Sequence, residues 1–202
     1  IPVITFDSDS TKSKRLCYLG TNNYEAGKAA GEAALKLMPT AGKWVAFVGN
    51  MTTANARERY QGFVDATKGK AEILAEPFQD LTDKNVAIRN AKDALTKYGD
   101  KVNGFVGLYA YNGPACLKAV EEAGKLGKVK LVTFDGDPDT LAALQAKKID
   151  AAVVQKPYEF GRLSVKLLTL INRKGYEAAM TELKPELEKM GMKPKGNIID
   201  TG

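Results

Sequence analysis

Short apolar runs with strand character alternate with helical patterns along almost the whole chain, and this alternation restricts the fold more than any other feature. After an opening run at 1–7, the strand-like runs lie at 43–49, 71–77, 102–110, 129–135 and 149–155, and the helical patterns lie at 24–38, 54–68, 84–98, 113–124, 139–147 and 157–173. Strands that alternate with helices at this spacing form βαβ units and a parallel sheet. The runs are apolar at nearly every position, as expected where helices cover both faces of a sheet. The sequence therefore predicts an α/β fold with a doubly wound parallel sheet.

Composition excludes several classes of protein. The chain has 202 residues, 44% of them hydrophobic, and no apolar run reaches the roughly 18 residues that a membrane helix needs. The net charge is +6, but the lysines are scattered and no stretch interleaves basic residues with aromatics, so we expect no nucleic-acid partner. His is absent, and Cys17 and Cys116 form no CxxC pair, which excludes zinc sites and His-based catalysis. We interpret Cys116 as a small buried hydrophobe and expect no metal, cofactor or catalytic residue.

Polar residues follow the apolar runs where strands of a parallel sheet would end, which is where such sheets bind ligands. They are Asp7 after 3–6, Asn50 and then Arg57 after 47–49, Tyr109, Tyr111 and Asn112 after 105–108, Asp135 after 131–134, and Gln155 after 152–154. Carboxylates that accept hydrogen bonds, a guanidinium that donates them, an amide that does both and aromatic faces suit a ring with adjacent hydroxyls. The set favours a neutral polyol over a nucleotide.

The arginines near the start of the predicted helix 54–68 have two interpretations. Arg57 lies in about the first turn, where its charge opposes the helix dipole at a cost of some tenths of a kcal/mol. We therefore attribute it to a partner outside the helix. Glu58 and Arg59 are interpreted as exposed residues or members of ion pairs within the helix.

A rival motif occupies the first strand end. Residues 7–11, with the sequence DSDST, match the DxDxT motif of haloacid-dehalogenase-like phosphohydrolases, in which the first Asp attacks phosphorus and the second acts as acid and base with magnesium. The later acidic pair of that family has only a loose substitute at 135–139. That stretch is also no calcium loop, because Thr140 and Ala146 replace the required Gly and Glu. A phosphohydrolase is kept as the alternative function.

Six segments, in this order, are IPVITFDSD (1–9), GTNNYEAG (20–27), NARERYQGF (55–63), YNGPA (111–115), VTFDGDP (132–138) and QKP (155–157). Together they resemble the type I periplasmic sugar-binding proteins of ABC transporters, the ribose, galactose and simple-sugar group that is related to the LacI repressor core. The resemblance covers residues 1 to about 175. A sugar-responsive repressor core of the LacI type is the third candidate function.

The resemblance implies a non-enzymatic, periplasmic and monomeric binding protein. Two α/β lobes would close about a hinge on a monosaccharide, ribose-like or another simple sugar, and the closed form would deliver it to the membrane permease. Carried over by position, Asp7 and Asp135 are the carboxylates of the two lobes that bind sugar hydroxyls. Arg57 grips ring or anomeric oxygens, and Gln155 is the amide at the hinge. Tyr109 stands where many members have Asn, so the hydroxyl pattern recognised there differs.

The same resemblance assigns parts of the chain to lobes. Residues 1–19 would be the end of the N-terminal lobe and a crossover, 20–155 the C-terminal sugar-binding lobe, 156–175 a helix that returns to the first lobe, and 176–202 a charged helix extension with a return strand. On this interpretation the chain is a fragment that lacks most of the N-terminal lobe, and by itself it would bind sugar weakly or not at all.

Overall fold

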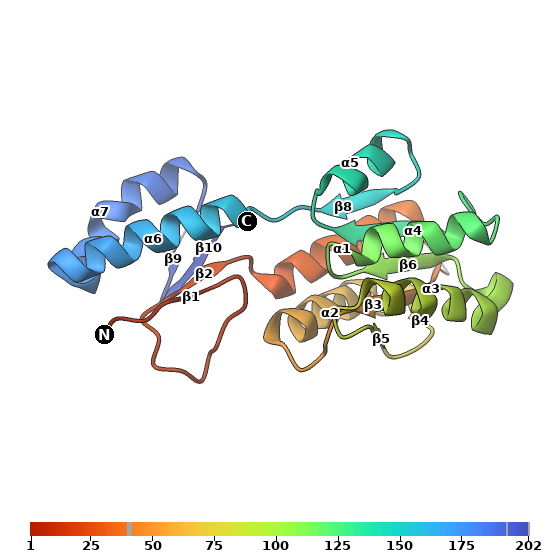
Figure 1. Cartoon of the computed structure of the whole chain (residues 1–202), viewed down its shortest axis with the longest axis horizontal. Coiled ribbons are helices and arrows are strands. Elements are labelled where there is room, and N and C mark those ends of the chain that lie inside the picture. Colours follow the sequence, from red (N-terminus) through yellow and green to blue (C-terminus); the bar gives the residue numbers. More distant parts are fainter. Residues whose placement is uncertain (40–41, 193, 202) are drawn as a thin grey trace. The chain divides into compact units, whose positions relative to one another are not determined.

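The chain forms two compact units (Figure 1). The computed structural model describes residues 1–39, 42–192 and 194–201. The larger unit is Asn23–Val154, and the smaller unit joins Ile1–Asn22 to Gln155–Gly202.

The larger unit is built on a six-stranded sheet in which every pair of strands is parallel. In spatial order its strands are β4 (Ala71–Ile73), β3 (Gly42–Val48), β6 (Gly104–Gly107), β7 (Lys130–Phe134) and β8 (Ala151–Val153), and β5 (Phe78–Gln79) also pairs with β3. The helices are α1 (Asn23–Leu37), α2 (Ala54–Thr67), α3 (Lys84–Tyr98), α4 (Asn112–Glu122) and α5 (Pro138–Gln145), and a short 3₁₀ turn, Gly99–Lys101, follows α3. The predicted α/β fold with a doubly wound parallel sheet is confirmed.

Both faces of this sheet are buried, which explains why its strands are continuous apolar runs. On β3, Val45 and Phe47 pack with the cluster formed by α3, α4 and α5. The alternate residues Trp44, Ala46 and Val48 pack with α1 and α2 on the other face. Successive side chains of a strand point to opposite faces, so each face needs its own apolar residues.

Glycines let the backbones of α1 and α2 touch. A Cβ atom at Gly27 would lie 2.1 Å from the carbonyl oxygen of Arg59, and one at Gly62 would lie 2.1 Å from that of Tyr24. A Cβ at Gly31 would lie 2.7 Å from the Cβ of Ala66. The contact fixes the position of α2 on the sheet, and with it the direction of the side chains on the first turns of α2.

The smaller unit has a four-stranded sheet covered by two helices. The strand order is β1 (Thr5–Phe6), β2 (Tyr18–Gly20), β10 (Ile198–Asp200) and β9 (Pro194–Lys195), with only β9 antiparallel to its neighbour. Apolar residues of α6 (Pro157–Lys174) and α7 (Tyr176–Lys189) pack on Cys17, Leu19 and Ile199. The predicted helix at 157–173 is therefore present, and the charged helix and the return strand expected within 176–202 are α7 and β10.

Three short strands were not predicted. The sequence predicts a crossover that ends at residue 19, a single strand at 71–77 and no strand at 194–195. The structure has β2 at the first place, ends β4 at Ile73 and adds β5 after Pro77, and has β9 at the third. Strands of two or three residues are too short to carry a periodic pattern. No helix among the described residues is long and apolar enough to cross a membrane.

Both cysteines are free and buried. Cys116 is 2% exposed in the core of the larger unit, which confirms the prediction that it is a small buried hydrophobe. Burial raises the pKa of the Cys17 thiol to about 11 and raises that of Cys116 as well. Both therefore remain protonated thiols at neutral pH.

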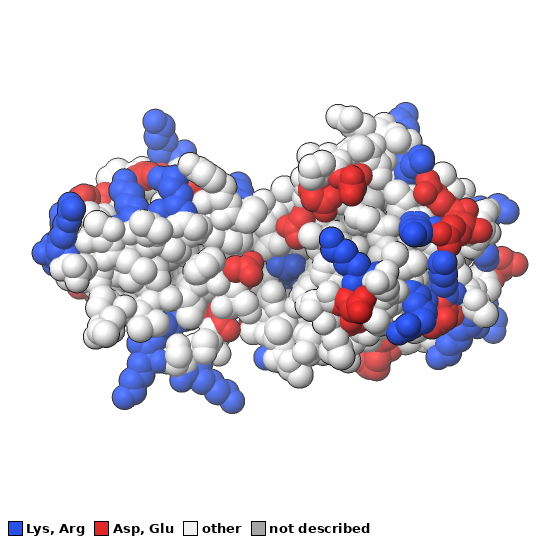
Figure 2. All heavy atoms as spheres, in the orientation of Figure 1, with Lys and Arg blue, Asp and Glu red and all other residues white. Residues whose placement is uncertain are grey.

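The positive charge is dispersed over the larger unit. On the face shown in Figure 2, blue and red atoms alternate over this unit. Several of its lysines form ion pairs at the surface, such as Lys92 with Glu122 at 2.5 Å and Lys148 with Glu121 at 2.8 Å. Such pairs between exposed side chains contribute little to stability.

An ion pair closes the loop between β1 and β2. Arg15 donates from Nε and Nη2 to the two carboxylate oxygens of Asp9, both at 2.5 Å, and the Thr5 hydroxyl donates to Asp9 at 2.7 Å. The Arg15 and Asp9 side chains are 5% and 10% exposed. Burial acts to raise the pKa of Asp9, but the hydrogen bonds from Arg15, Thr5 and the Ser10 N–H outweigh it, so the pKa lies below its ordinary value.

Replacement of Gly62 by Ala should destabilise the protein. The added methyl group would meet the Tyr24 carbonyl on α1, so we expect the free energy of unfolding in urea to fall by about 1–3 kcal/mol. Gly161 on α6 is the matched control, because a Cβ there would meet nothing within 4 Å. Gly161→Ala should leave stability unchanged or raise it by up to about 1 kcal/mol. Equal effects of the two substitutions would contradict the close helix contact.

The ion pair of Asp9 should make stability depend on pH in acid. A carboxyl group whose pKa is lowered by folding stabilises the fold above its unfolded pKa, and the effect is lost as the pH falls through the folded value. Asp9→Asn should therefore cost about 1–3 kcal/mol of unfolding free energy near pH 7. The difference from wild type should shrink below the ordinary pKa of 3.8. Asp93→Asn, at an exposed position of α3, is the control and should change stability little. A deficit that stays constant down to about pH 3 would refute the assignment.

Candidate ligand-binding site

The candidate site in the larger unit lies at the carboxyl edge of its sheet. Tyr109 and Asp135 follow the neighbouring strands β6 and β7, and Arg57 stands near the start of α2, after β3. Three of the predicted site residues thus come from one edge of one sheet. The other two belong to the smaller unit, where Asp7 follows β1 and Gln155 precedes α6.

The two predicted carboxylates share an unusual backbone conformation. Asp7 has a φ of 62° and Asp135 a φ of 67°, both in the left-handed region. Each follows the last residue of its strand, and each N–H donates to a carbonyl of the next strand, Asp7 to Leu19 at 3.1 Å and Asp135 to Val153 at 2.8 Å. A residue with a side chain pays about 1–2 kcal/mol for this conformation. Leu81, Thr82 and Lys147 also have positive φ, so the binding role of the two carboxylates stays a prediction.

Tyr109 is held from three sides. The carbonyl of Leu108, the residue before it, accepts a hydrogen bond from Arg59 Nη1 at 2.7 Å. The N–H of Tyr109 donates to Asn112 Oδ1 at 3.0 Å, and its hydroxyl contacts Thr53 Oγ1 at 2.9 Å and Asn55 Oδ1 at 3.3 Å. The peptide group and the ring are therefore both fixed.

Arg59 is buried, which corrects its interpretation as an exposed residue. It is 3% exposed, its Nε donates to Asn23 Oδ1 at 2.8 Å, and its guanidinium lies 4.6 Å from the ring centroid of Phe134 and 5.8 Å from that of Tyr109. The burial of Arg59 could have been predicted from its spacing to Ala56 and Phe63. Positions i, i+3 and i+7 share one face of a helix, and this face of α2 is buried.

Arg57 is exposed near the start of α2, in the turn where the sequence placed it. Its Nη1 donates to the carbonyl oxygens of Met51 at 3.1 Å and Thr52 at 2.5 Å. These bonds hold the side chain over the loop between β3 and α2. The ligand role of Arg57 stays a prediction.

Asp80 is a residue that the sequence analysis missed. It is 1% exposed and accepts hydrogen bonds from the Tyr111 hydroxyl at 2.5 Å, Asn112 Nδ2 at 2.8 Å and the Thr82 N–H at 2.9 Å. Burial and the bond to Asp80 raise the pKa of Tyr111. Asn112 is fully buried and links Asp80 to the backbone of Tyr109, so its amide supports the site from within. If β5 had been predicted from the sequence, Asp80 would have been identified as the polar residue that follows a strand.

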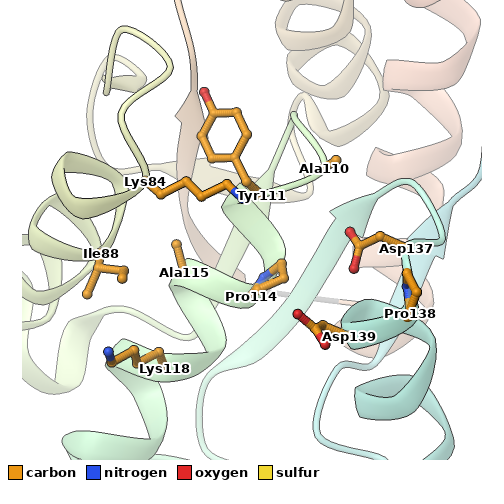
Figure 3. A pocket seen from close by; sticks show the side chains of 10 residues that line it. All are labelled: Lys84, Ile88, Ala110, Tyr111, Pro114, Ala115, Lys118, Asp137, Pro138 and Asp139. Atoms are coloured by element: carbon orange, nitrogen blue, oxygen red, sulfur yellow. The ribbon is translucent and has the colours of Figure 1, made fainter.

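A groove of about 600 Å³ lies beside this edge, where α3, α4 and α5 begin (Figure 3). Figure 3 shows Lys84 and Lys118 on the side of α3 and α4, and the carboxylates of Asp137 and Asp139 on the side of α5. Asp137 caps α5 by accepting from the Thr140 N–H at 3.0 Å. None of the five predicted site residues lines the groove as the structure describes it. Within the described ranges, no group of His, Cys, Asp and Glu is arranged to hold a metal ion.

The chain is similar to curated sugar-binding proteins over most of its length. It is 31% identical to the ribose import binding protein RbsB of Salmonella typhimurium over 171 residues, which are 83% of this chain and 56% of the relative. It is 25% identical to the D-allose-binding periplasmic protein of Escherichia coli over 162 residues, 78% of this chain and 51% of the relative. The chain thus spans little more than half the length of these relatives.

Solved structures of sugar-binding proteins have the same fold. GanP, a glucose-galactose binding protein from Geobacillus stearothermophilus, matches with a TM-score of 0.78 and 30% identity over 100% of this chain and 66% of its own. An ABC transporter solute-binding protein from Burkholderia graminis, in complex with D-arabinose, matches with a TM-score of 0.79 and 28% identity over 100% of this chain and 65% of its own. The model of the periplasmic binding protein domain matches residues 1–175. The chain therefore belongs to the periplasmic binding protein domain family.

Proposed function

We propose that the protein is the solute-binding component of an ABC transporter. It binds a monosaccharide, ribose-like or another simple sugar, through hinge closure of two lobes and delivers it to the membrane permease from the periplasm. We assign the smaller unit, Ile1–Asn22 with Gln155–Gly202, to one lobe and the larger unit, Asn23–Val154, to the other. The observation that carries the proposal is the left-handed backbone of Asp7 and Asp135 at equivalent strand ends of the two units.

Each proposed site residue has chemistry that suits a sugar. The carboxylates of Asp7 and Asp135 accept hydrogen bonds from pairs of adjacent hydroxyls. Arg57 donates to ring or anomeric oxygens, and the amide of Gln155 both donates and accepts. Tyr109 offers its ring to the C–H face of the sugar. The relatives named for ribose and D-allose and the structural neighbour in complex with D-arabinose support this ligand class.

The structure disfavours the phosphohydrolase alternative, because its second carboxylate, Asp9, is bound by Arg15. Asp9 would have to act as acid and base, but its two oxygens accept hydrogen bonds from Arg15, and its pKa is lowered. A carboxyl group held ionised in this way is a poor proton donor near neutral pH. We therefore favour binding without catalysis.

A panel of neutral monosaccharides should bind to the protein as its gene encodes it. We expect at least one sugar to raise the melting temperature and to give a measurable Kd by calorimetry. Arg57→Ala or Asp135→Ala should each weaken binding by about 1–3 kcal/mol, roughly 5- to 150-fold in Kd, because a charged hydrogen-bonding group is lost.

Two exposed residues outside the proposed site are matched controls. Arg89→Ala and Asp93→Ala, both on α3, should leave the Kd unchanged. Failure of every neutral sugar to bind would refute the ligand class. Magnesium-dependent release of phosphate from a generic ester, abolished by Asp7→Asn, would instead establish the phosphohydrolase.

A further inference from the structure

The groove at the starts of α3, α4 and α5 has an apolar floor and a charged rim. Pro114 is half-buried and Ala115 is 5% exposed, whereas Lys84, Lys118 and Asp139 are exposed. An apolar centre within a polar, accessible rim is the usual anatomy of a protein–protein interface. The groove therefore suits a partner protein that covers its floor with an apolar side chain.

The two walls of the groove carry opposite charges. Lys84 on α3 and Lys118 on α4 stand on one wall, and the carboxylates of Asp137 and Asp139 stand on the other, at the start of α5 (Figure 3). Within the part of the chain that the structure describes, Lys84, Lys118 and Asp139 form no ion pair and no hydrogen bond. The two walls do not pair with each other, so both charges are available to a partner.

Local structure explains the acidic wall but not the lysines. Asp139 lies in the first turn of α5, where the helix dipole favours a carboxylate. Lys84 is the first residue of α3, where the same dipole disfavours an ammonium group. Lys118 lies one turn before Glu122, but that carboxylate pairs with Lys92 at 2.5 Å. A carboxylate from a partner would thus meet two ammonium groups that the fold leaves without an ion pair.

The groove adjoins the edge of the larger sheet at which we propose that the sugar binds. Ala110, which lines the groove, directly follows Tyr109, and Asp137 is two residues beyond Asp135. A protein that receives the sugar has to contact this one beside the place where the sugar leaves. The groove is positioned for that contact.

We propose that this groove docks the membrane permease. An exposed segment of the permease places an apolar side chain on the floor, an acidic side chain beside Lys84 and Lys118, and a basic side chain beside Asp139. The inference rests on the proposed function and names the surface that its partner uses. Complementary charges speed the encounter and fix the register of a complex, and burial of the apolar side chain adds affinity.

Sugar uptake by cells separates docking from sugar binding. Cells that lack the gene would receive the wild-type gene or a Lys84→Glu, Lys118→Glu double variant. Uptake of radiolabelled D-ribose, or of the panel sugar that binds more tightly, would be measured well above its Kd. We expect the double variant to lower uptake about tenfold, because reversed charges slow productive encounter. Asp139→Lys, which reverses the other wall, should act in the same direction.

The Kd of the purified variants for the same sugar, measured by calorimetry, should equal that of wild type, because no proposed site residue lines the groove. Arg89→Glu with Lys128→Glu is the matched control. It makes the same change in net charge as the lysine double variant at exposed residues outside the groove, and uptake should stay at the wild-type rate.

The inference is overturned if the groove variants fold and support normal uptake, or if their Kd rises in parallel with the loss of uptake. It is also overturned if sedimentation shows a wild-type dimer that the variants disperse, because the occupant would then be a second copy of this chain. Should the double reversal fail to fold, Lys84→Gln with Lys118→Gln decides by the same measurements. Absence of sugar binding or of gene-dependent uptake with the wild-type protein would instead refute the proposed function itself.

Discussion

The buried guanidinium of Arg59 organises the edge of the larger sheet. It binds Asn23 at the start of α1 and the carbonyl of Leu108 at the end of β6, and it lies against the ring of Phe134 at the end of β7. Burying a charge costs several kcal/mol unless its N–H groups find acceptors, so these elements are held together as a set. The residues that follow the two strands, Tyr109 and Asp135, are the ones for which we propose ligand contacts.

Close helix packing makes that arrangement possible. Gly27 and Gly62 bring α1 and α2 into backbone contact, which places Arg59 under the strand ends rather than in solvent. Asp80 supports the same edge from the other side through Tyr111 and Asn112. Rigid support of this kind lowers the entropy that binding would otherwise cost, because the contacting groups are already ordered.

The sequence was sufficient for the fold class and for part of the candidate site. The alternation of apolar runs and helical patterns is a local property, and α3 spans the residues that its pattern predicted. The rule that ligands bind beyond the carboxyl ends of parallel strands then selected Tyr109 and Asp135 from their positions after apolar runs. The same local rule did not find Asp80, because β5 has two residues and no pattern of its own.

The sequence by itself determined the α/β architecture, its parallel sheet and the polar residues that follow its longer strands, because periodicity and strand ends are encoded by neighbouring residues. Only the tertiary structure decided which of two nearby arginines is buried, that Asp7 and Asp135 adopt left-handed backbone, and that the Tyr109 hydroxyl is bound by Thr53 and Asn55. Burial and hydrogen-bond partners depend on segments that are far apart in the chain. Arg59 and Leu108 or Asp80 and Asn112 meet only after the strands have paired and the helices have packed on them.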